Sequence, residues 1–374
     1  MRGSEGAVLL TGATGFVGME LLARQLERTN RPVVTLIRAP NDEAARARLD
    51  AVLANLFGYR AGRYAGRVTA IAGDLTAPRL GLDPLRWERL ASTTETIVHG
   101  AASVSFALPL EEARTINLEG TRRMLELAAC AREHGVLDRY AHISTAYVAG
   151  NHAGRFSERD LDLGQGFHNS YEQSKFEAEQ LVRSWHDLPF TILRPSIVVG
   201  DRNSGWTAAF NVLYWPLRAL SRGVFPAVPA TPASPVDVVS IDYVADAIHE
   251  LCQGAGDAGQ TYHLTAGPEA STMGEIVSFA SGYFHRPGPK LVPPAEFARV
   301  AQGVAQSVLE EGSVYFPYFH VAATFDDSFT RARLEPAGIR VSPLRDYLGR
   351  LLDFATRARW GKRPIARAEA WAAF

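Results

Sequence analysis

The stretch 7–18 reads A-V-L-L-T-G-A-T-G-F-V-G, in which an apolar run leads into a glycine-rich turn and then into an apolar-periodic segment. This order predicts a buried strand followed by a helix. Gly12 can adopt a backbone angle that a side chain would disfavour, Gly15 lets the backbone approach a pyrophosphate, and Gly18 lets the helix lie against its strand. Because helix N-termini attract anions, the stretch predicts nucleotide binding rather than an ordinary glycine-rich turn.

Composition limits the other possibilities. The chain has 374 residues, of which 47% are hydrophobic, so we expect one large domain or two intertwined ones. A net charge of -1 gives no bulk attraction to nucleic acid or to an anionic membrane. Two cysteines make no disulfide framework. We find neither a signal peptide nor an apolar run long enough to span a bilayer, and therefore expect a soluble, cytoplasmic protein.

Predicted strands and helices alternate as far as residue 265, which predicts an α/β fold with a doubly wound, parallel (Rossmann) sheet. The domains are expected to be a nucleotide-binding part over 1–205 and 236–265, and a smaller, mostly helical substrate-binding part over 206–235 and 266–374. The main strands are expected at 7–10, 33–37, 68–72, 96–99, 140–144, 190–193 and 261–264, and the main helices at 42–57, 110–116, 121–134, 169–183, 242–252 and 344–358.

Two features carry candidate chemistry. Tyr171 and Lys175 form a Y-x-x-x-K pair inside a predicted helix, and this spacing places both side chains on one helix face. A nearby ammonium group favours the phenolate, so we expect the pKa of Tyr171 to be lowered towards working pH. Ser144 and Thr145 follow a predicted strand. Each feature alone is common on ordinary helices and strand ends, but their combination with the glycine turn is rare.

These residues resemble the extended short-chain dehydrogenase/reductases. The resemblance implies that Tyr171 exchanges a proton with the substrate oxygen, that Lys175 holds the nicotinamide ribose and lowers the tyrosine pKa, and that Thr145 hydrogen-bonds the reacting oxygen. It also implies that Asn117 is structural and that 194–200 lies beside the nicotinamide.

Further stretches of the sequence resemble particular groups within this family. The stretches 97–106, 142–148 and 193–200 are similar to fatty acyl reductases and to thioester reductase domains, and the match covers roughly residues 5–250. No carrier or adenylating domain precedes the fold, so we expect a stand-alone unit, and the group that presents the substrate stays open. Oligomeric state is likewise open.

The expected cofactor is NADPH. The second strand ends in Leu36-Ile37-Arg38 without a carboxylate, and a guanidinium suits a ribose 2′-phosphate. The resemblance implies that Arg48 assists, although Arg46 is equally near, and that Asp74 and Leu75 contact the adenine. The expected cofactor-binding set is Gly12, Thr14, Gly15, Phe16, Val17, Gly18, Arg38, Arg48, Asp74, Leu75, Ala101, Ala102, Ser144, Tyr171, Lys175, Pro195, Ser196 and Ile197.

The chemistry that remains is direct hydride transfer to a carbonyl. Cys130 and Cys252 lie in helical, apolar surroundings, which argues against a cysteine nucleophile. No histidine stands at a ligand spacing from a cysteine or aspartate, so no metal is expected. The leading hypothesis is an NADPH-dependent reductase of a CoA- or carrier-bound acyl thioester, giving an aldehyde or, after a second hydride, an alcohol.

Three alternatives stay open. Two are enzymes of the same family, a ketone or aldehyde reductase and a sugar-nucleotide epimerase or dehydratase. The third is a non-enzymatic NADP-sensing regulator. The apolar and aromatic stretches 206–225 and 314–319 argue against a sugar nucleotide. We expect 206–225 to be helical, with Phe210 and Trp215 either packed beneath the smaller domain or lining an acyl pocket.

Overall fold

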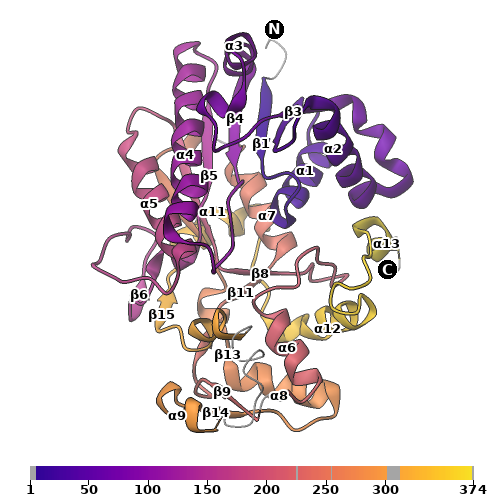
Figure 1. Cartoon of the computed structure of the whole chain (residues 1–374), viewed down its shortest axis with the longest axis vertical. Coiled ribbons are helices and arrows are strands. Elements are labelled where there is room, and N and C mark those ends of the chain that lie inside the picture. The colour runs from indigo at the N-terminus through magenta and orange to yellow at the C-terminus, as the bar shows by residue number, and fades with distance from the viewer. Residues whose placement is uncertain (1–5, 225, 254, 301–311, 373–374) are drawn as a thin grey trace.

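A seven-stranded parallel sheet forms the centre of the computed structural model, which describes residues 6–224, 226–253, 255–300 and 312–372. The sheet confirms the predicted α/β, doubly wound class, and Figure 1 shows it in the upper half of the view. Its strands, in spatial order, are β12 (Gln260–Leu264), β7 (Phe190–Pro195), β5 (Arg139–Ile143), β4 (Thr94–His99), β1 (Ala7–Thr11), β2 (Val33–Ile37) and β3 (Val68–Ala72).

Helices cover both faces of this sheet because its strands are apolar on both sides. In β1, Val8 and Leu10 pack into one core cluster with α1 and α7, whereas Leu9 packs into another with α3 and α4. This alternation is the period of two expected for a strand. The covering helices are α1 (Phe16–Arg28), α2 (Asp42–Phe57), α3 (Pro84–Thr93), α4 (Leu110–Glu133), α5 (Ser170–Ser184) and α7 (Ile241–Leu251).

Capping residues set the starts of two of these helices. The Asn41 side chain accepts the Ala44 N–H at the start of α2, and Asn169 accepts the Glu172 N–H at the start of α5. The two helices predicted at 110–116 and 121–134 are instead one helix, α4. A Cβ atom on Gly120 would lie 3.1 Å from the Leu75 Cβ atom, so this mid-helix glycine serves close packing rather than a break.

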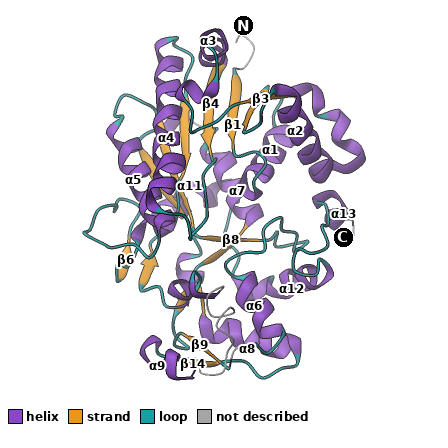
Figure 2. Cartoon of the chain, viewed as in Figure 1, coloured by secondary structure: helices purple, strands orange, loops and turns teal. Residues whose placement is uncertain are grey.

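Segments after residue 150 that lie outside the central sheet build a smaller part, which Figure 2 shows below the sheet. Its strands form four short pairs: β6 (Gly154–Phe156) with β15 (Ala323–Phe325), β8 (Ile197–Val199) with β11 (Val238–Ser240), β9 (Ala227–Pro229) with β14 (Lys290–Val292), and β10 (Pro235–Val236) with β13 (Ser271–Thr272). The other helices within the described residues are α6 (Tyr214–Ser221), α8 (Met273–Phe284), α9 (Pro294–Val300), α11 (Ser328–Leu334), α12 (Leu348–Arg357) and α13 (Arg367–Ala372).

The end of the chain returns to the nucleotide-binding part. Helix α13 packs against α2, and α11 packs against β12. The domain boundaries given by the sequence stay a prediction, and these contacts show how closely the two parts are joined. No helix within the described ranges is both long and apolar enough to cross a membrane.

The stretch 206–225 is helical only over α6, which corrects the expectation of a long helix. Trp206 is fully buried outside that helix, where its indole N–H donates to the Ile365 carbonyl at 3.1 Å. Phe210 stacks on Phe354 of α12 and thus packs against the smaller part of the molecule. Phe225 lies outside the described residues. Similarly, the helix predicted at 344–358 begins with a separate 3₁₀ turn over Leu344–Asp346 before α12.

Candidate active site

A single cleft of about 760 Å³ opens at the carboxyl ends of the central strands. This is the edge at which open parallel sheets bind ligands. The expected catalytic residues Thr145, Tyr171 and Lys175 all line it. Every member of the expected cofactor set also lines it: Gly12, Thr14, Gly15, Phe16, Val17, Gly18, Arg38, Arg48, Asp74, Leu75, Ala101, Ala102, Ser144, Pro195, Ser196 and Ile197.

The glycine turn has the geometry that its spacing predicts. Gly12 has a φ of +82°, in the left-handed region that favours glycine. A Cβ atom on Gly18 would lie 2.0 Å from the Gly12 carbonyl oxygen, so α1 approaches the strand as closely as expected. The Thr11 hydroxyl accepts the N–H groups of Gly100 and Ala101, which fixes the turn against the end of β4. The N-terminus of α1 therefore faces the cleft across a bare backbone cradle.

Two arginines stand at the β2 end of the cleft. Arg38 is exposed, and the Arg48 guanidinium donates to the Arg38 carbonyl and, at 3.4 Å, to the Thr14 hydroxyl. Arg46 instead pairs with Asp50 at 2.8 Å. The structure thus distinguishes the two candidates, because Arg48 lies beside the nucleotide turn and Arg46 does not.

Asp74 follows β3, the strand beside β2, and lies within the electrostatic range of Arg38. Its carboxylate accepts the backbone N–H and the hydroxyl of Thr76, both at 2.8 Å. The bond from the Thr76 backbone is the main cause that lowers the pKa of Asp74. A fixed, ionised carboxylate at this position suits hydrogen bonding to an adenosine group.

Lys175 and Tyr171 reach the cleft from α5. The Lys175 ammonium donates to the Ile143 carbonyl at 2.7 Å, and burial lowers its pKa to about 8. Burial raises the pKa of Tyr171 to about 12, while a hydrogen bond with Thr145 acts in the opposite direction. The expected lowering of the tyrosine pKa by Lys175 is therefore wrong for this structure, since desolvation dominates.

The two hydroxyl residues after β5 point to different partners. The Thr145 hydroxyl is 3.5 Å from the Pro195 carbonyl and accepts the Tyr147 N–H, so it stays at the cleft beside Tyr171. The Ser144 hydroxyl donates to Glu179 at 2.9 Å, within a buried cluster of charged groups. Its bond is structural, and cofactor binding by Ser144 stays a prediction.

Asn117 joins three elements around the site. Its side-chain oxygen accepts the Ser103 N–H at 2.7 Å, and its amide nitrogen donates to the Ser103 carbonyl and the Ser174 hydroxyl. These bonds tie the loop after β4 to α4 and α5, and so give Asn117 the structural position that the resemblance implies.

The site also contains aromatic residues that the sequence did not single out. Tyr318, in the 3₁₀ turn η7 (Phe316–Phe319), stacks on Phe106 at 5.1 Å, and Phe106 contacts the ring of Tyr171. The Tyr318 hydroxyl donates to the buried Glu172 carboxylate at 2.7 Å and accepts from Asn169. Tyr318 and Glu172 are 146 residues apart, so no local spacing predicts their contact. The aromatic character of 314–319 was the one sequence signal that indicated a role for this segment.

The cysteines lie away from the cleft. Burial raises the pKa of Cys252 to about 12 and also raises that of Cys130, so neither is activated as a nucleophile. The expectation that no histidine stands at a ligand spacing from a cysteine was wrong. Cys130 lies in the last turn of α4, His134 directly follows that helix, and the ligand atoms of the two residues are within 4.8 Å of one another and of Glu88. None of the three lines the cleft.

Comparisons with known proteins agree with this architecture. Residues 10–248 match the NAD-binding family model described as "Male sterility protein". The chain is 35% identical over 254 residues to an isonitrile lipopeptide synthase of Streptomyces coeruleorubidus, which covers 67% of this chain and 17% of that protein. It is 31% identical over 287 residues to a carboxylic acid reductase of Mycobacterium tuberculosis (strain ATCC 25618 / H37Rv), with 69% and 24% covered.

A solved structure is similar over nearly the whole chain. The terminal R domain from the myxalamid PKS-NRPS biosynthetic pathway superposes with a TM-score of 0.83 and 26% identity, covering 98% of this chain and 94% of that one. By contrast, this chain spans less than a quarter of the length of the two curated relatives.

Proposed function

Because the chain belongs to the male sterility protein family of NAD-binding proteins, we propose that it is an NADPH-dependent reductase that converts a bound acyl thioester to an aldehyde. The predicted membership of the extended short-chain dehydrogenase/reductases, and with it the oxidoreductase class, is confirmed. One observation carries the finer proposal: a single cleft joins the glycine turn, two arginines and the Thr145, Tyr171 and Lys175 side chains.

The residues present fit a dinucleotide with a 2′-phosphate. A Cβ atom at Gly12 would lie 2.8 Å from the Gly100 backbone, so a side chain does not fit at this position. The glycine leaves the backbone open where the pyrophosphate would bind. Arg38 and Arg48 would hold the 2′-phosphate, and Lys175 the nicotinamide ribose. NADPH would supply the hydride when bound.

Side chains of the protein donate hydrogen bonds to the carbonyl oxygen of the substrate. With a pKa of about 12, Tyr171 is protonated at neutral pH and can donate to an oxygen on which negative charge develops. Thr145 is a second donor at the same place. Transfer of the phenolic proton to that oxygen gives a hemithioacetal, whose C–S bond then breaks to release a thiol and an aldehyde. The phenolate is reprotonated from water.

The presenting group is proposed to be a carrier-bound phosphopantetheine thioester, on the similarity to a terminal R domain of a PKS-NRPS pathway. The aromatic lining by Phe106, Tyr147 and Tyr318 supports an acyl substrate over a sugar nucleotide. NADPH consumption with acyl-carrier protein, acyl-CoA, free aldehydes and a UDP-sugar, with products identified by mass spectrometry, tests these assignments. Absence of turnover on every carbonyl substrate would favour an NADP-sensing role.

Replacing Arg38 by alanine is expected to weaken NADPH binding by about 10- to 100-fold and to leave NADH binding nearly unchanged. The substitution removes a charge-assisted contact to the 2′-phosphate of NADPH, whereas NADH has no 2′-phosphate and so makes no such contact. The dissociation constants of both cofactors, measured by fluorescence titration, check this. Arg46→Ala is the matched control, since Arg46 pairs with Asp50 instead. Equal losses for both cofactors would assign Arg38 another role.

The activity is expected to fall as pH rises through about 8. Lys175 must be charged to hold the ribose, its pKa is lowered to about 8, and so its ammonium form is lost above that pH. Tyr171, with a pKa of about 12, does not titrate in this window. The measurement is kcat/KM from pH 6 to 10, which reports the free enzyme. In Lys175→Arg the descending limb should move up by more than one pH unit, and an unmoved limb contradicts the assignment.

A further inference from the structure

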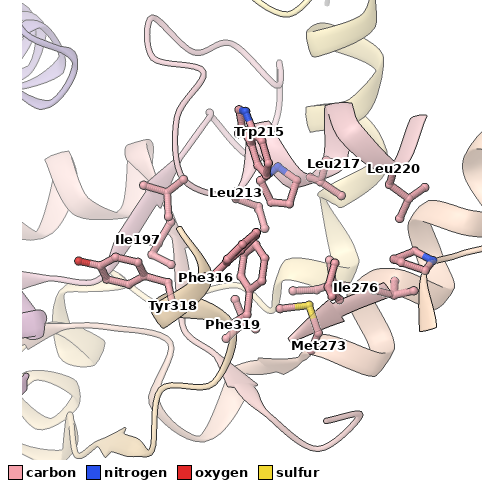
Figure 3. Close-up of a pocket in the computed structure, with 16 residues that line it drawn as sticks. Ile197, Leu213, Trp215, Leu217, Leu220, Met273, Ile276, Phe316, Tyr318 and Phe319 are labelled. Atoms are coloured by element: carbon pink, nitrogen blue, oxygen red, sulfur yellow. The ribbon is translucent and has the colours of Figure 1, made fainter. Parts of the chain in front are cut away.

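A second, smaller cavity lies within the smaller part of the molecule, beside the active-site cleft. It has a volume of about 50 Å³ and is lined from α6 by Leu217, from α8 by Met273 and Ile276, and from η7 by Phe319 (Figure 3). Leu213, directly before α6, also lines it. None of the described residues that line it is charged. Of the two aromatic residues expected in an acyl pocket, Trp215 lines this cavity and Phe210 does not.

The cavity adjoins the cleft, because Ile197, Val212 and Tyr318 line both. Ile197 follows directly on Pro195 and Ser196 at the cleft. The Tyr318 ring forms the boundary, and its hydroxyl is held by Glu172 and Asn169 on the α5 side. Figure 3 shows this hydroxyl directed away from Met273 and Ile276, so that only apolar atoms of Tyr318 face the cavity.

Backbone strain marks the same boundary. Val212 has a φ of +40°, and a β-branched residue rarely adopts the left-handed region. Residues held in such conformations cluster at ligand sites because the surrounding packing over-determines them. The strained valine is thus an observation independent of the lining, and it lies where the cleft meets the cavity.

Resting on the proposed function, we propose that this acyl cavity receives the distal part of the substrate's acyl chain and restricts the enzyme to apolar acyl groups. A polar or charged tail would lose its hydration there without gaining a partner. The volume corresponds to about four water-sized groups, hence to about four successive methylenes beyond the Tyr318 boundary. Each methylene buried there should tighten binding by about 4-fold.

The test uses the whole chain with two chain-length series from two to twelve carbons. Acyl N-acetylcysteamine thioesters report turnover with NADPH, and the matching unreactive amides report binding by calorimetry in the presence of NADP⁺. We expect the dissociation constant to fall about 4-fold per carbon over a run of about four carbons and then to level off. A chain with a terminal carboxylate should lose this gain.

Two variants change the cavity in opposite directions. Ile276→Phe fills it and should shorten the run by two or more carbons, whereas Leu217→Ala enlarges it and should lengthen the run. Phe279→Ala, on the same helix but 38% exposed and outside the lining, is the matched control and should leave the run unchanged. Thermal melting reports whether each variant folds. If Ile276→Phe does not fold, the chain-length series with Leu217→Ala tests the proposal.

The outcomes separate the two proposals. Binding that is flat with chain length, or a run that neither Ile276→Phe nor Leu217→Ala changes, overturns the acyl cavity even if thioesters are reduced. A run of tightening amides without reduction of any thioester supports the cavity and overturns the proposed function.

Discussion

Replacing Tyr171 by phenylalanine is expected to lower kcat by about 10²- to 10⁴-fold, because proton transfer from a positioned group contributes a rate factor of this size. The substitution removes one hydroxyl and keeps the ring that contacts Phe106. Packing around α5 should therefore persist, and NADPH affinity should stay within about twofold of the original. Stopped-flow measurement of NADPH oxidation on a thioester substrate, beside a cofactor titration, gives both quantities.

A second buried tyrosine provides the control. Tyr140 lies on β5, outside the cleft, and within the described part of the chain its hydroxyl has no hydrogen-bond partner. Tyr140→Phe should therefore keep the rate and the melting temperature, since nothing is lost with its hydroxyl. A Tyr171→Phe variant that turns over at the original rate would remove Tyr171 from the mechanism and leave Thr145 as the donor to the carbonyl oxygen.

The nucleotide end of this site was predictable because its signals are local. Gly12 and Gly18 are constrained by contacts within a few residues of the turn or with the neighbouring strand end. The Tyr171–Lys175 spacing places both side chains at the cleft by helix geometry alone. Strands such as β2 and β3 were predicted to the residue, since each is a short apolar run bounded by polar or turn-forming residues.

What the sequence could not supply depends on long-range packing. Tyr318 joins the site through Glu172, far away in the chain, and Ser144, which lines the cleft, donates its hydroxyl to Glu179. Desolvation raises the pKa of Tyr171, and the spacing of residues in the sequence does not reveal how deeply a side chain is buried. The sequence predicted separate helices at 110–116 and 121–134, whereas α4 is one helix in which Gly120 packs closely against Leu75 although glycine is a weak helix former.

The fully buried Glu179 carboxylate stands at the centre of an ionic cluster behind the site, in which Arg194 is also fully buried and Arg183 is partly exposed. Arg194 donates to both of its oxygens, at 2.6 and 3.0 Å, Arg183 adds a further bond, and the Ser144 hydroxyl completes the set. Burial raises the pKa of Glu179, but Arg194 and Arg183 outweigh it, so the pKa lies below its usual range. The cluster joins β7, α5 and the residue that precedes Thr145.

Replacing Arg194 by methionine is therefore expected to reduce the free energy of unfolding by about 3–5 kcal/mol. The loss arises because Glu179 is left buried with its main partner missing, a cost that exceeds the net value of the pair itself. Chemical denaturation, followed by circular dichroism, measures it. The exposed Glu119–Arg122 pair on α4 supplies the contrast: Arg122→Met should change stability little, since solvent screens that pair.

The double variant Arg194→Met/Glu179→Met separates the two origins of this loss. If the cost comes from an uncompensated charge, removing that charge as well should recover most of the stability, because apolar side chains of similar volume often replace a buried ion pair without loss. If the double variant is as unstable as the sum of the singles, the groups act independently and the cluster argument is wrong. Recovered stability with impaired turnover would show that Glu179 also positions Ser144 and, through it, the Thr145 hydroxyl at the cleft.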